Sequence, residues 1–384
     1  MRRLAVTLLS LAAAAVVPSA QACDCGGCPP TSCGTSSSAS PGGNLLFLRG
    51  YGQHGPLKAI DTASGRQRFA LPPGIASADG RVYVSATQRA HRYTVVRTYD
   101  GRTGRPLRAR TYRGGGWSVA GVSANGRYIA LLDSFQRGRS TRIAIVRSRL
   151  GPAARTITLR GPYDVDALSN DGRRLFLIQY LRNGYLVRFY DVARRSLAAR
   201  VLTEKGAPMQ GLAWDALASP GGRYLFTLYL RGDGGAEIHT LDLRRGTAVC
   251  IDLPRGNPAS VQQYALALSS DGRMVYAVNP MLRLVATVEV PRRTVVRITH
   301  FHANASPATL SEVAVASHDG RTVYFTAGHE LFAYDSAYHT VRGAYSIGTT
   351  AMGLAFTRDD RRLLVVRADG GVLWLDAASG RRVR

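Results

Sequence analysis

Four cysteines near the start of this sequence have a spacing that could do chemistry. Cys23, Cys25, Cys28 and Cys33 form a C-x-C-x2-C-x4-C cluster, and a fifth cysteine, Cys250, lies far downstream. Thiolates this close in sequence could wrap one thiophilic ion such as zinc or copper(I). In an oxidising compartment the same side chains would form disulfides. The spacing leaves both alternatives open, and Cys250 could be a metal ligand or a disulfide partner in the same way.

The residues before this cluster have the pattern of a secretory signal peptide. Arg2 and Arg3 precede the apolar run Leu4–Val17, and Pro18–Ala22 provides an A-x-A cleavage site. The apolar run is too short for a comfortable transmembrane helix. We therefore expect a signal peptide over residues 1–22 and an exported protein that is extracellular, periplasmic or on the cell surface.

Cys23 follows the expected cleavage site directly, as the acceptor cysteine of a bacterial lipoprotein does. It is the lipidation candidate, and this lipid anchor would be the chain's one attachment to a membrane. Residues 23–43 are expected as a Cys-rich leader and a Gly/Ser-rich tether, a composition typical of flexible linkers. Ordinary cleavage after Ala22 explains the same residues. Residues 44–384 are expected to form a single domain.

A turn phrase recurs through the rest of the chain. Ser269–Val278 reads SSDGRMVYAV, and its central residues Asp-Gly-Arg are flanked by a polar cluster and an apolar strand. Related phrases begin at Ser77, Ser123, Ser169, Ser219, Ser317 and Thr357, with a weaker copy at Ser40. Successive copies are 37 to 50 residues apart. A repeat of this length, made of residues that favour β-strands, is typical of sheets arranged radially around an axis.

Each repeat has small residues before the turn and a strand that is apolar on both faces after it. Ala265–Ser269 is an example of the first kind, and Arg223–Leu230 of the second. Small side chains suit strands crowded around an axis, and two apolar faces suit sheets stacked on their neighbours. A second motif, D-x-x-[ST]-G, follows one hairpin later, as in Asp61–Gly65. It predicts the turn between a third and a fourth strand.

These two motifs resemble the repeats of YVTN-type and quinoprotein-like (PQQ-like) β-propellers, and the resemblance covers about residues 40–384. It implies an all-β propeller of four-stranded blades with eight repeats. Eight blades are favoured, but the first repeat has only three convincing strands and the chain ends in a stub. A seven-bladed ring with spare strands therefore stays open. The Gly-His and Trp-Asp signatures of WD repeats are missing.

Counting eight residues back from each turn glycine gives a ring of side chains at one mouth of the central channel. This ring includes Asp164, Trp214, Tyr264 and Glu312, and strand alternation points Asp166 the same way. Carboxylates beside large aromatic rings could hold a cation or a stacked polar ligand. No cofactor is expected, and a metal ion is the alternative.

His300 and His302 flank one residue, so alternation places both imidazoles on one strand face, where they could chelate a metal ion. The chain has no G-x-S-x-G, H-E-x-x-H or phosphate-loop motif. Lactonase-type propellers match its size and repeats, so a lactonase-like hydrolase at the channel mouth is the enzymatic alternative. Its catalytic residues are not identified by the sequence. A metal or redox protein using the N-terminal cysteines is the second alternative.

The net charge of +25 comes almost wholly from arginine, because Lys58 and Lys205 are the only lysines among 50 basic residues. The arginines are spread over every repeat, unlike the clustered basic patches of nucleic-acid-binding proteins. We expect no nucleic-acid partner. Positive charge favours anionic partners. The sequence therefore predicts a monomeric binding or scaffolding module for a cell-envelope protein or an anionic cell-wall polymer, rather than an enzyme.

Overall fold

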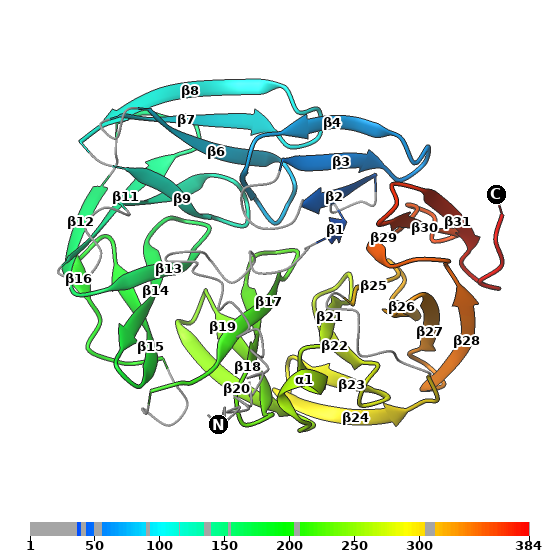
Figure 1. Cartoon of the computed structure of the whole chain (residues 1–384). Coiled ribbons are helices and arrows are strands. Elements are labelled where there is room, and N and C mark those ends of the chain that lie inside the picture. The colour runs from blue at the N-terminus through cyan, green and yellow to red at the C-terminus, as the bar shows by residue number, and fades with distance from the viewer. Residues whose placement is uncertain are drawn as a thin grey trace, which may run out of the picture.

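The computed structural model describes residues 37–39, 44–49, 56–89, 93–114, 116–133, 140–152, 155–202, 208–303 and 312–383. They form eight antiparallel sheets arranged as blades around a central axis (Figure 1). Seven of these sheets have four strands, and the last has three. The prediction of an all-β, eight-bladed propeller is confirmed, and the seven-bladed alternative is excluded.

Each blade is a meander whose first strand lies nearest the axis and whose later strands follow outward in chain order (Figure 1). The first four blades contain β1 (Ser37–Ala39), β2 (Leu45–Arg49), β3 (Leu57–Asp61) and β4 (Gln67–Leu71); β5 (Gly74–Ala76), β6 (Val82–Arg89), β7 (Tyr93–Asp100) and β8 (Pro106–Arg113); β9 (Trp117–Val122), β10 (Tyr128–Asp133), β11 (Ser140–Arg147) and β12 (Arg155–Arg160); and β13 (Tyr163–Leu168), β14 (Arg174–Leu181), β15 (Gly184–Asp191) and β16 (Ser196–Leu197).

The last four blades follow the same plan. They contain β17 (Leu212–Ala218), β18 (Tyr224–Leu230), β19 (Ala236–Asp242) and β20 (Thr247–Leu253); β21 (Ala265–Leu268), β22 (Met274–Asn279), β23 (Leu284–Glu289) and β24 (Thr294–His300); β25 (Ala314–Ala316), β26 (Thr322–Ala327), β27 (Glu330–Asp335) and β28 (Thr340–Ser346); and β29 (Ala351–Phe356), β30 (Arg362–Arg367) and β31 (Val372–Asp376). The short helix α1 (Pro258–Val261) lies between blades 5 and 6. No helix in the described part of the chain is long and apolar enough to cross a membrane.

The recurring S-x-D-G-R phrase is a hydrogen-bonded turn between the first and second strands of a blade. In blade 6, Ser269 Oγ donates to Asp271 Oδ1 (2.6 Å) and accepts from the N–H of Met274 (2.9 Å). The same Asp271 oxygen accepts from the N–H of Arg273 (3.0 Å). Gly272 between them has a φ of +70°, which glycine adopts without strain. Blades 2, 3, 4, 7 and 8 repeat this network, with asparagine in place of aspartate in blade 3.

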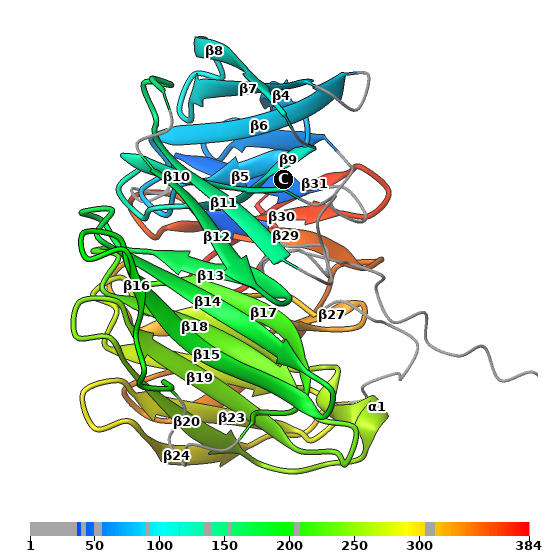
Figure 2. The same ribbon diagram turned by 90° about the vertical axis from the view of Figure 1, so that its left-hand side faces the viewer.

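The turn between the third and fourth strands uses aspartate in a similar way. In blade 1, Asp61 Oδ1 accepts from the N–H groups of Ala63 (3.0 Å) and Ser64 (2.7 Å). In every blade a backbone hydrogen bond joins the two kinds of turn; in blade 2 the N–H of Gly101 donates to the carbonyl of Arg81 (2.8 Å). Both kinds therefore lie on one side of the ring, which we call the turn face. Helix α1 projects from the opposite side (Figure 2).

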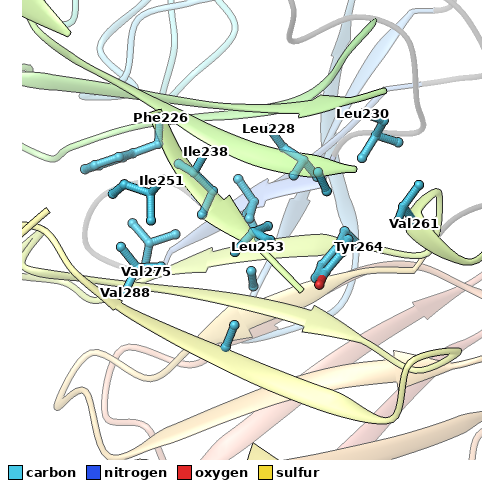
Figure 3. Packing of buried hydrophobic residues seen from close by; sticks show 14 of the residues in the cluster. Phe226, Leu228, Leu230, Ile238, Ile251, Leu253, Val261, Tyr264, Val275 and Val288 are labelled. Atoms are coloured by element: carbon cyan, nitrogen blue, oxygen red, sulfur yellow. The ribbon is translucent and has the colours of Figure 1, made fainter. Parts of the chain in front are cut away.

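Apolar side chains fill the space between neighbouring blades. Between blades 5 and 6, Phe226, Ile238 and Val275 are fully buried and pack together (Figure 3). The strand faces that point away from this cluster pack against the next blades, so the second and third strands are apolar on both sides. The inner strands contribute small residues such as Ala265 and Ala267. Burial of this apolar area is the main stabilising contribution in such a fold.

Blade 8 closes the ring by packing against blade 1. Leu46 and Leu48 of β2 pack with Leu364 and Val366 of β30. Strand β1 pairs with β2 and also lies beside β29. Ser37–Ala39 belongs to the segment expected as a tether, so the first blade begins earlier than the boundary expected from the sequence. Each blade consists of its own consecutive strands.

Candidate functional site

The structure brings two of the predicted channel residues together on the innermost strand of blade 4. Asp164 and Asp166 lie on β13, and their exposed fractions are only 4% and 7%. Asp164 is opposite Ile178 and accepts a hydrogen bond from the hydroxyl of Tyr180 (2.9 Å). A β-bulge between Val165 and Ala167 leaves Asp166 as the extra residue of the strand. Such a bulge re-aims a side chain, which is common near binding sites.

Asp166 is a buried titratable group with a strongly shifted pKa. Neither of its carboxylate oxygens has a hydrogen-bond partner among them. Burial alone raises its pKa to about 7, because transfer of the charged form from water is unfavourable. The carboxyl group therefore exchanges its proton near neutral pH. It could act as a general acid, or accept hydrogen bonds from a cationic group.

Blade 5 presents a polar group of side chains toward this strand. Burial raises the pKa of Tyr229, and the neighbouring Asp166 charge adds to that shift. The ring of His239 meets Tyr229 edge-on, with centroids 6.1 Å apart. Cys250 Sγ lies 3.6 Å from His239 Nδ1, and burial lowers the pKa of His239 to about 4. The imidazole is therefore neutral at physiological pH.

The other three predicted mouth residues lie elsewhere. Trp214 packs against the core between blades 5 and 6, and Tyr264 is buried within that core (Figure 3). The Tyr264 hydroxyl donates to the carbonyl of Pro254 (2.9 Å). Glu312 accepts from the hydroxyl of Thr326 and so braces blade 7. Trp214 and Tyr264 thus take part in the packing between blades 5 and 6.

Asp215 is an inner-strand carboxylate that the sequence count missed. A bulge at Trp214 shifts the register of β17, so Asp215 rather than Trp214 pairs opposite Leu228. Burial raises the pKa of Asp215, and hydrogen bonds from the N–H groups of Ala216 and Leu266 oppose that shift. A count that allowed one bulge per inner strand would have found this residue.

The predicted metal ligands are not gathered by the fold. His300, at the end of β24, and His302 are exposed on either side of the buried Phe301. Within the described ranges no group of three or more His, Cys, Asp or Glu side chains could hold a metal ion. Cys250 lies on β20. The other four cysteines, Cys23, Cys25, Cys28 and Cys33, lie outside the described residues.

A second candidate site is the turn face itself, which the motifs did not single out as a site. An arginine directly follows the first turn of seven blades: Arg81, Arg127, Arg173, Arg223, Arg273, Arg321 and Arg361. In blades 2, 4, 6, 7 and 8 the carboxylate of this turn accepts from a backbone N–H group, and in blade 5 Arg223 instead donates to Asp242 of the second turn. In blade 2 the exposed fraction is 69% for the Arg81 side chain and 20% for that of Asp79. Arginines scattered in the sequence are therefore gathered in space.

The comparisons with known proteins agree with the fold and go no further. No protein-family model matches the chain, and no curated protein matches its sequence. Among solved structures it is similar to the dihydro-heme d1 dehydrogenase NirN in complex with DHE, with a TM-score of 0.55 and 18% identity over 90% of this chain and 74% of that one. It is also similar to a eukaryotic initiation factor, with a TM-score of 0.54 and 14% identity over 91% and 86% of the two chains. At such identities the likeness shows the propeller fold alone.

Proposed function

We propose that this propeller is exported and serves as a binding or scaffolding module in the cell envelope, where it holds an anionic partner. Export rests on the signal-peptide pattern of residues 1–22, and lipidation of Cys23 stays a prediction. Eight blades packed into a closed ring provide a rigid support with two broad faces. A rigid surface loses little conformational entropy when a partner binds.

One observation carries this proposal, namely the unequal exposure of charges on the turn face. The side chains of Arg321 and Arg361 are 82% and 85% exposed, whereas those of their neighbours Asp319 and Asp359 are 50% and 58% exposed. The hydrogen bond from Thr357 and the N–H of Arg361 hold the pKa of Asp359 below its usual value. The carboxylates accept hydrogen bonds within the turns and lie 3.9 Å from the guanidinium groups, which are the more exposed partners of these ion pairs. Such a surface attracts polyanions and speeds their encounter.

A pull-down from a solubilised envelope fraction tests the proposal. The chain starting at Gly34 is the bait, and washes of increasing salt separate specific retention from general charge attraction. We expect a stoichiometric anionic partner that survives moderate salt. Recovery of no partner, or loss of every bound component at the first increase in salt, would contradict the binding role.

A lactonase-like hydrolase is the second candidate, and Asp166 is the observation that favours it. A carboxyl group whose pKa is about 7 can donate and accept a proton near neutral pH, as a general acid–base catalyst does. Hydrolysis of simple γ- and δ-lactones by the purified chain, abolished in Asp166→Asn and unchanged in Asp271→Asn, would support it. A wild-type chain that turns over none of these lactones removes this candidate.

A further inference from the structure

The acidic residues of the repeated turns are missing in one part of the ring. The third position of the S-x-D-G-R phrase is Asn125 in blade 3 and Gly221 in blade 5, where blades 2, 4, 6, 7 and 8 have aspartate. The second turn of blade 3, Arg147–Leu150, has no carboxylate either. In the two turns of blade 3 the arginines keep their places without a carboxylate, and in blade 5 Arg223 pairs with Asp242 of the second turn instead (3.1 Å). The turn face is therefore not uniformly charged.

We call the turns of blades 3, 4 and 5 the basic sector. Its arginines are Arg127, Arg147, Arg149, Arg173, Arg174, Arg194, Arg195, Arg223, Arg244 and Arg245, and its carboxylates are Asp171, Asp191 and Asp242. The turns of blades 6, 7 and 8 have Arg273, Arg292, Arg293, Arg321, Arg358, Arg361, Arg362, Arg381 and Arg382 against Asp271, Glu289, Asp319, Asp335, Asp359, Asp360 and Asp376. Ten arginines thus face three carboxylates in the first set, and nine face seven in the second. The excess positive charge lies on one side of the face.

Hydrogen bonds between blades hold the basic sector together. Asn125 donates twice to Asn170: its N–H reaches Asn170 Oδ1 (2.9 Å) and its Nδ2 reaches the Asn170 carbonyl (3.1 Å). Asn170 Nδ2 in turn donates to the carbonyl of Gly221 (3.1 Å). An aspartate at position 125 could not donate from its side chain, so the asparagine both removes a negative charge and links two blades. The guanidinium groups of three blades are therefore carried on turns with fixed relative positions.

We propose that the basic sector binds a linear polymer of phosphate groups, and this inference rests on the proposed envelope-binding function. A guanidinium group offers a planar fork of donors that matches two oxygens of a phosphate. Arginines spread over three neighbouring blades suit a ligand whose anionic groups recur along a chain, because each group bound raises the effective concentration of the next. Such binding depends strongly on salt, because it releases counterions from the polymer.

The absence of exposed apolar side chains in these turns favours a polymer over a membrane surface. The large exposed hydrophobic side chains of blades 4 and 5 in the described part of the chain are Tyr180, Leu181 and Leu212. Tyr180 and Leu181 end strand β14 and Leu212 begins β17, so all three lie away from the turn face. Peripheral membrane binding normally needs apolar side chains beside the basic ones. The basic sector offers charge and hydrogen bonds only.

Two triple variants with equal change in net charge test the site. The sector variant carries Arg127→Gln, Arg149→Gln and Arg195→Gln. The control variant carries three changes at exposed arginines of fourth strands, away from the turn face, namely Arg108→Gln, Arg160→Gln and Arg297→Gln. Binding of long-chain inorganic polyphosphate is measured at fixed salt by anisotropy, and thermal unfolding confirms that both variants fold.

A third variant restores the missing acid without removing an arginine. Gly221→Asp is tolerated sterically, because a Cβ at that position meets nothing within 4 Å. The new carboxylate would accept from Ser219 and Arg223 as in the other blades, so stability should be unchanged or slightly higher. The added negative charge should nevertheless weaken polyphosphate binding. A loss of affinity in a chain that is no less stable cannot be attributed to unfolding.

We expect a Kd for polyphosphate at least about tenfold higher in the sector variant, and less than about twofold higher in the control. Equal losses in the two triple variants would overturn the site, since binding would then follow net charge alone. Binding of polyglutamate as tight as that of polyphosphate would show that the site does not select phosphate groups. Binding only to vesicles of anionic lipid would show that the ligand is a membrane surface and not a polymer. Envelope pull-down by wild type together with no polyphosphate binding would reject this inference and leave the envelope-binding function standing.

Discussion

The folded protein favours the neutral form of the Asp166 carboxyl group, whereas water favours the charged form. Its carboxyl group has no hydrogen-bond partner among the described residues, and burial raises its pKa from the ordinary value of 3.8 to about 7. The folded protein therefore holds a proton that the unfolded chain releases between these values. The contribution of Asp166 to stability is highest below about pH 4, where both states are protonated, and falls as pH rises toward 7.

Replacing Asp166 by asparagine removes this pH dependence. We expect the free energy of unfolding of wild type to be roughly 2–3 kcal/mol lower at pH 8 than at pH 5 because of this residue, and the slope to disappear in Asp166→Asn. Urea titrations at several pH values measure it. The matched control is Asp271→Asn, because the hydrogen bond from Ser269 keeps the pKa of Asp271 below its ordinary value. Identical slopes in wild type and Asp166→Asn would show that the Asp166 carboxyl group has the same pKa in the folded and unfolded chains.

The pair on β13 could be predicted from the sequence, but its surroundings could not. Counting back from the turn glycine places Asp164 and Asp166 on an inner strand, since strand alternation is a local property. The same count gives Tyr264, which is buried between blades 5 and 6, because the length of each inner strand and its bulges depend on packing between blades. Burial of a side chain is a tertiary property. A register counted from one turn therefore identifies candidates and not their neighbours.

Asp360 shows how one turn compensates for departing from the repeat. It occupies the glycine position with a φ of +54°, a conformation that costs a non-glycine residue roughly 1 kcal/mol. Its carboxylate accepts from the N–H groups of His318 (3.0 Å) and Asp319 (2.9 Å), and Oδ1 also lies 2.6 Å from His318 Nδ1. These contacts join blade 8 to blade 7. Hydrogen bonds to a charged group contribute about 1.5–3 kcal/mol each, so they outweigh the strain.

Asp360→Gly should therefore destabilise the protein although it relieves an unfavourable φ. We expect a net loss of roughly 1–2 kcal/mol in the free energy of unfolding, since the contacts with blade 7 are only partly shielded from water. Arg293→Gly is the control, because Arg293 has a φ of +57° in an exposed turn. That change should leave stability unchanged or slightly higher. A more stable Asp360→Gly chain would mean that the contacts between these blades contribute less than the strain.

At the level of elements, the sequence predicts what local chemistry determines. The two turn motifs specify hairpins through Asp, Ser and Gly, so the blade count follows from their number. The first strand of blade 1 could not be predicted, because Ser37–Ala39 reads as a small polar linker with no strand propensity. It becomes a strand through pairing with β2, a contact that only the closed ring provides. The bulges in β13 and β17 have the same origin.

The fold of the whole molecule makes the charge uneven in space, although the arginines look evenly spread in the sequence. Each of the last seven repeats carries arginine at the same place, so no stretch of sequence is unusually basic. The fold brings all of these positions to one face, and the loss of acids at Asn125 and Gly221 then matters because their turns are neighbours in space. Because the repeats are equivalent in the fold, arginines that are scattered in the sequence lie together on the turn face. A hypothesis about partners requires the three-dimensional arrangement, whereas the fold required only the period.

Ring closure also belongs to the whole molecule, and it depends on the short strand β1. This strand covers the inner edge of β2 and lies beside β29 of the last blade. Without it the edge of β2 is unpaired, and an exposed edge strand pairs readily with another chain. Two truncated chains that differ only in this strand can therefore separate closure from the rest of the fold.

A chain starting at Asn44 should be less stable than one starting at Ser37. We expect a Tm lower on the order of 5 °C, together with self-association through the free edge of β2. Differential scanning calorimetry gives the Tm, and size-exclusion chromatography with light scattering gives the mass of each chain. The longer chain should behave as a monomer, because its first blade is complete. If both chains melt together and remain monomeric, the packing of Leu46 and Leu48 against blade 8 is enough to close the ring, and β1 is dispensable.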